Sequence, residues 1–160
     1  MVTVKHSGYK DLELPVNVAR GLTTSADFVL EVDPYQFTGF DAPVDMPTKA
    51  NLNITNIGTA GKNIPLKWHL SDGKGVDVST SDKFNLVLDL QKTCTQGLTD
   101  EIEVYDPATT TPGLSYQGNG NWHYNWKTTK TVSFIGQCYK VYLVFDNQEI
   151  SPIAQFRFKS

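Results

Sequence analysis

Three aromatic side chains alternate along one short segment and could form a platform for sugar rings. Trp122, Tyr124 and Trp126 occur at every second position, so an extended segment places all three on one face. Because a domain of this size rarely leaves several large aromatic side chains in water, the pattern favours a row in the core, with the polar residues between them in solvent. Sugar binding by this row, with Tyr35 and Phe40 as further stacking residues, is the alternative.

The two cysteines could form a disulfide. Cys94 follows a predicted strand that ends near Leu90, and Cys138 opens another, so both lie near strand ends. No CxxC spacing is present, which argues against a zinc site. Closing the chain between them would stabilise the fold by about 4 kcal/mol. Two buried free thiols are the alternative.

Neither histidines nor carboxylates show the spacing of a metal site. The histidines occur singly, and we expect all three at the surface. Several aspartates could offer oxygen ligands to calcium, but their spacing favours roles in turns and caps. These aspartates are Asp33, Asp41, Asp45, Asp72 and Asp77. The sequence predicts no metal and no cofactor.

No catalytic set can be assigned from spacing. Ser79, Ser81 and Ser133 lie outside any G-x-S-x-G motif, and the five glutamates are spread along the chain. No glycine-rich loop precedes a predicted helix. We therefore predict that the protein is not an enzyme.

Strands must position these side chains. Apolar and polar residues alternate with period two in several segments, and no long window has a helical period of 3.6. The clearest segments are residues 64–70, 84–90 and 154–158, with earlier ones at 12–18, 28–32 and 51–57. Turn-forming residues rich in Gly, Asn, Asp and Pro separate them. This pattern predicts an all-β, immunoglobulin-like antiparallel β-sandwich, with a small Greek-key barrel as the alternative.

The chain divides at residue 32. Residues 1–32 are predicted to be an N-terminal strand pair or docking arm, and residues 33–160 the sandwich. Residues 33–47 contain three prolines and a glycine, which disfavours regular pairing. Their aromatic side chains predict an extended connector that packs against the sandwich.

Composition excludes two classes of partner. The 160 residues carry a net charge of -3 with no basic block, so nucleic acid is not an expected partner. The longest apolar runs, such as residues 141–145, fall far short of the roughly 20 residues of a transmembrane helix. We expect no membrane insertion.

Residues 60–68, with the sequence AGKNIPLKW, resemble the motif of the PxKF domains of bacterial extracellular proteins. Residues 37–45, 124–128 and 154–159 and the position of Cys138 are similar to other parts of that family, so the resemblance covers about residues 34–159. Trp68 stands where the family usually has Phe, and residues 96–116 depart from its pattern.

The resemblance implies a small β-sandwich module with a similar cysteine pair and no recognised catalytic residues. Such modules usually sit near the end of larger secreted or surface proteins. We therefore expect a non-catalytic structural or adhesive module at an extracellular or cell surface. Its expected partner is a protein surface or a larger parent protein.

The first residues show neither the basic segment nor the apolar segment of a signal peptide. The chain is then expected to be either a piece of a longer secreted protein or a complete product of the cytoplasm. In the second case it would be a decoration protein of a phage capsid or tail, with residues 1–32 docking to the virion surface. A carbohydrate-binding module, with glycan as partner, is the remaining alternative.

Overall fold

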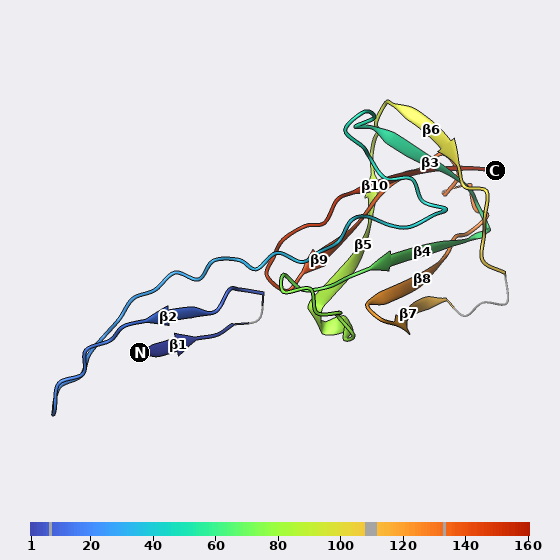
Figure 1. Cartoon of the computed structure of the whole chain (residues 1–160). Coiled ribbons are helices and arrows are strands. Elements are labelled where there is room, and N and C mark those ends of the chain that lie inside the picture. The colour runs from blue at the N-terminus through green and yellow to red at the C-terminus, as the bar shows by residue number, and fades with distance from the viewer. Residues whose placement is uncertain (7, 108–111, 133) are drawn as a thin grey trace.

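Alternating apolar residues pair into strands throughout the computed structural model, which describes residues 1–6, 8–107, 112–132 and 134–160. Within these residues the chain forms ten strands, a short 3-10 turn at Ser81–Lys83 and no α-helix (Figure 1). The strands are β1 (Val2–Val4), β2 (Leu12–Leu14), β3 (Ile54–Thr59), β4 (Asn63–His69), β5 (Phe84–Gln91), β6 (Leu98–Glu101), β7 (Gly113–Gly118), β8 (Asn121–Lys127), β9 (Cys138–Phe145) and β10 (Ala154–Lys159).

The strands build a sandwich of two sheets, which confirms the predicted fold class. One sheet has the order β5-β9-β10-β3-β6 and the other the order β4-β8-β7. The sandwich is not wholly antiparallel, because β3 runs parallel to both β10 and β6. The chain passes from β3 into the other sheet at β4, so the neighbours of β3 arrive by crossovers and not by hairpins. The described strands do not close into the alternative Greek-key barrel, since each sheet ends in strands paired on one side only.

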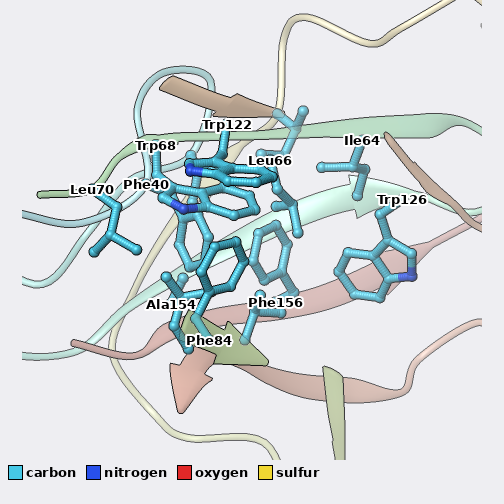
Figure 2. Packing of buried hydrophobic residues seen from close by; sticks show 14 of the residues in the cluster. Phe40, Ile64, Leu66, Trp68, Leu70, Phe84, Trp122, Trp126, Ala154 and Phe156 are labelled. Atoms are coloured by element: carbon cyan, nitrogen blue, oxygen red, sulfur yellow. The ribbon is translucent and has the colours of Figure 1, made fainter. Parts of the chain in front are cut away.

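The core lies between the two sheets, where the period-two rows face each other. In the β4–β8 pair, Ile64 lies opposite Trp126 and Trp68 lies opposite Trp122. Their side chains meet those of the larger sheet, and Figure 2 shows the rings of Trp122, Trp68 and Phe84 gathered in one cluster. Edge-to-face contacts at centroid distances of 5.0 to 5.7 Å connect these three rings. The alternation seen in the sequence therefore sorts the two faces of each sheet.

The connector is extended and packs against the sandwich, as predicted. Phe40 and Val44 are 4% exposed. Fully buried Asn56 of β3 holds the connector, because its Oδ1 accepts from the Asp45 N–H at 2.7 Å and its Nδ2 donates to the Asp45 carbonyl at 2.9 Å. A third hydrogen bond, from Nδ2 to the Gln155 carbonyl, links the connector to β10.

Residues 1–32, here called the arm, extend away from the sandwich (Figure 1). The predicted strand pair forms only as the short β1 and β2. Residues 28–32, predicted to be a strand, do not form one: among the described residues, the segment makes only a single bridge, from Val32 to Tyr9, with the Lys10 N–H donating to the Glu31 carbonyl. A period-two pattern indicates that a segment can pair, but pairing also requires a sheet edge within reach.

Candidate functional site

The alternating aromatic row belongs to the core. Trp122 and Trp126 are each 5% exposed, and Tyr124 is half-buried. Trp122 Nε1 donates to the Val78 carbonyl at 2.9 Å, which satisfies the polar end of the buried ring. Sugar stacking needs an exposed ring face, and burial leaves none at either tryptophan.

The other two residues considered for stacking lie in the connector. Phe40 is buried against Trp68 at a centroid distance of 5.7 Å. Tyr35 is half-buried, stacks on Phe145 at 4.7 Å and donates its hydroxyl to Asp146 Oδ1 at 2.8 Å. Both residues hold the connector against the sandwich.

Cys94 and Cys138 form a disulfide, as predicted. Their Cα atoms are 5.3 Å apart, within the usual span of a disulfide. The bond joins the end of the β5 region to the start of β9, and the chain between them carries β6, β7 and β8. It therefore joins two neighbouring strands of the larger sheet and closes a loop that carries strands of both sheets.

The surface prediction holds for His6 and His69 but is wrong for His123. The His123 side chain is 19% exposed, and its Nε2 lies 2.8 Å from Asp106 Oδ2. Neither atom has another hydrogen-bond partner among the described residues. The cause is the segment after β6, which bridges Asn63 at Asp106 and so covers part of the predicted polar face of β8. Asn125 on that face is also buried, with 1% of its surface exposed.

The aspartates do not assemble a metal site. No group of three or more potential ligands comes together within the described ranges. Asp72 fills a turn, as predicted, since its Oδ1 accepts from the backbone N–H groups of Lys74 and Val76 at 2.9 and 2.8 Å. Asp77 lies 3.2 Å from His69 Nε2.

Asp45 faces other acidic groups. Desolvation raises the pKa of Asp45, and the neighbouring Asp100 and Glu103 raise it further. A carboxyl with a raised pKa in the folded state binds a proton that the unfolded chain has already lost. Stability therefore falls as the pH rises from 3.8, the ordinary pKa, through the raised pKa, and the loss remains at neutral pH.

Asp45→Asn is accordingly expected to raise the melting temperature at about pH 7 and to leave it unchanged at about pH 3, where the Asp45 carboxyl is protonated in both the folded and the unfolded chain. Thermal unfolding followed by circular dichroism at the two pH values measures this. Asp27→Asn on the exposed arm is the control, expected to change neither value. An equal shift from Asp45→Asn at both pH values would refute the electrostatic explanation.

The base of the arm is seated on the sandwich. Gly8 has φ +77°, and a Cβ there would lie 2.7 Å from Asn147 Cβ, so this close approach requires glycine. The Asp33 N–H donates to the Gly8 carbonyl at 2.9 Å, and Lys74 Nζ lies 3.5 Å from Asp11 across the junction. The arm is thus held at its base, while its tip is directed outwards (Figure 1).

A cleft of about 280 Å³ lies at this junction. Its walls are mainly polar, with His6 and Tyr9 from the arm and Lys74, Thr80 and Lys83 from the sandwich. Ion pairs at its rim are exposed and contribute little to stability. The cleft therefore separates part of the arm from the sandwich with mainly polar walls.

The arm carries the exposed apolar side chains that a binding surface needs. Val29 is 87% exposed, Val18 79%, Leu22 70% and Phe28 49%. Large apolar side chains gathered on a projecting segment are typical of a surface that a partner covers. Sequence reasoning assigned docking to residues 1–32 but did not identify these side chains, because their exposure depends on the fold.

Comparison of the chain with protein-family models, curated proteins and solved structures finds no match. The resemblance to PxKF domains therefore stays a prediction from the sequence. In the described part of the chain, no helix has the length and apolar character needed to cross a membrane.

Proposed function

We propose that this chain is a non-catalytic structural or adhesive module, displayed on an extracellular or virion surface and attached through its arm. The observation that carries the proposal is the contrast between a sandwich with a buried aromatic core and an arm whose apolar side chains Val18, Leu22 and Val29 are exposed. A folded domain with one extension that exposes apolar side chains is suited to attachment to a partner surface.

The disulfide supports a location outside the cytoplasm. Disulfides persist in secreted proteins and on cell and virion surfaces and are rare in the reducing cytosol. The bond between Cys94 and Cys138 therefore favours display over an intracellular role.

The proposed partner is a protein surface, provided by a larger parent protein, a cell envelope or a phage capsid or tail. The arm offers mainly apolar side chains, and the net charge of -3 does not favour an anionic partner such as nucleic acid. A glycan partner has lost its main support, because Trp122 and Trp126 are buried.

A binding assay tests this function. Labelled full chain is incubated with intact cells, and separately with purified phage particles, from the source culture, and bound protein is measured after washing. We expect binding to one of these surfaces and at least a tenfold loss of affinity for the double variant Leu22→Asp and Val29→Asp, because burying two such side chains contributes more than the roughly 1.4 kcal/mol of a tenfold change.

Val132→Asp is the matched control, since Val132 is 91% exposed but lies outside the arm. It is expected to bind like the unmodified chain. Undiminished binding by the arm variant would contradict attachment through the arm, and failure of the unmodified chain to bind cells or particles would contradict the proposed display.

A further inference from the structure

The sandwich is open along one flank, where β5 and β7 are the outermost strands. Ile64 of β4 reaches toward β3, because a Cβ at Gly58 would lie 2.9 Å from its Cδ1. Trp126 of β8 contacts Tyr139 of β9 and Phe158 of β10. Across the sandwich, β4 thus lies over β3, and β8 lies over β9 and β10. Because β7 follows β8 in its sheet, it lies at the same side of the sandwich as β5, the edge strand next to β9.

Apolar side chains at this flank are incompletely covered. The inward rows of β5 and β7 end there, and we call their members the open flank: Leu86, Leu88, Leu90, Leu114 and Tyr116. Leu90 is 54% exposed, and Leu114 and Tyr116 are each 39% exposed. These side chains face the interior layer of the sandwich but lack a full set of neighbours there.

β5 is also the least protected edge. It is eight residues long, without proline, and pairs only with β9 among the described residues. In contrast, β6 is short and acidic at its end, β7 contains a bulge and a glycine at each end, and connector residues bond to part of β4, as in the Asp41 N–H to Lys67 carbonyl bond of 2.7 Å. A long, unprotected edge strand is a template for a further strand.

The arm contains a segment with the properties of that missing strand. Phe28, Leu30 and Val32 alternate with Val29 and Glu31, which is a strand pattern with one apolar face. One edge of the segment forms a backbone hydrogen bond within the arm, since the Lys10 N–H donates to the Glu31 carbonyl at 2.8 Å. In an extended chain, the N–H and C=O groups of residues 28, 30 and 32 then point to the other edge, and no backbone hydrogen bond to these groups occurs among the described residues.

We propose that residues 28–32 of one copy add to the β5 edge of a second copy and cover its open flank. The proposal rests on the proposed role of the arm as the attachment element and names one partner, another molecule of the same chain. In each copy the segment leads into the base of the arm, where the Asp33 N–H donates to the Gly8 carbonyl, and Figure 1 shows the arm extending away from the sandwich. Among the described residues β5 pairs only with β9, so the contact we propose is one between two copies. Strand addition then pairs backbone groups and buries apolar side chains from both copies.

Sedimentation velocity of the full chain over a wide range of concentration tests this. We expect association that grows with concentration and weakens at least tenfold in Phe28→Asp, on the arm, and in Leu90→Asp, on β5. Leu52→Asp is the control, because Leu52 is 74% exposed and lies outside both surfaces. Circular dichroism checks that each variant is folded.

A mixture of the two variants gives the decisive comparison. Phe28→Asp retains an intact flank and Leu90→Asp retains an intact arm, so the mixture can form one unaltered contact that neither variant forms alone. Association in the mixture should exceed that of either variant. A wild-type chain that stays monomeric, or a mixture no better than its components, overturns the proposal. A monomer that still binds cells or particles through its arm rejects only the copy-to-copy contact and leaves the proposed function standing.

Discussion

Trp68→Ala is expected to lower the free energy of unfolding by about 3 to 5 kcal/mol, a large part of the stability of a domain of this size. Trp68 is fully buried between the sheets, and its ring makes edge-to-face contacts with Phe40 and Phe84. Truncation loses the transfer free energy of the indole and leaves a cavity at the centre of the core. Urea unfolding followed by circular dichroism measures the change.

Two further variants separate packing from other causes. Trp68→Phe is expected to cost less than half as much, because it keeps a ring and removes an indole N–H that has no hydrogen-bond partner among the described residues. Leu22→Ala on the exposed arm is expected to change stability by less than about 0.5 kcal/mol. A Trp68→Ala variant within about 1 kcal/mol of the unmodified chain would refute a central packing role for this ring.

Loss of the disulfide is the second large effect we expect. The double variant Cys94→Ala and Cys138→Ala should be about 4 kcal/mol less stable, because the sequence separation of 44 residues makes the closed loop long and the bond restricts the unfolded chain. The strands β6, β7 and β8 lie within that loop, so without the bond the unfolded chain gains freedom over a segment that carries strands of both sheets.

Urea unfolding with and without a reducing agent provides the measurement. Reduction should destabilise the unmodified chain by a similar amount and leave the alanine variant unaffected. Equal stability of the oxidised and reduced forms would show that the bond does not restrict the unfolded ensemble as assumed.

Much of the sandwich could be predicted from the order of residues because strand periodicity is a local property. The alternation at residues 64–70 and 84–90 marks strands, and the same alternation sends Leu66 and Trp68 inward. The aromatic row on β8 was assigned to the core for the same reason. The cysteine pair could be predicted because both residues lie at strand ends.

The errors occur where a local pattern meets a distant segment. His123 has the spacing of a solvent-facing residue, yet the segment carrying Asp106 lies over it. Residues 28–32 have a strand pattern, yet within the described residues only the single bridge between Val32 and Tyr9 forms there. Strand direction was also missed, since a parallel β3 depends on crossovers between sheets.

The sequence by itself determined which segments can be strands, which face of each strand is apolar and where a disulfide is feasible. These properties depend on the period-two alternation of apolar residues and on the positions of the cysteines relative to the strands, which can be read from residues close together in the chain. Only the tertiary structure decided the strand order, the partial covering of His123 beside Asp106, the seating of the arm at Gly8 and the exposure of Leu90 at the flank. These features arise from contacts between residues far apart in the chain, and such contacts exist only after the two sheets have packed.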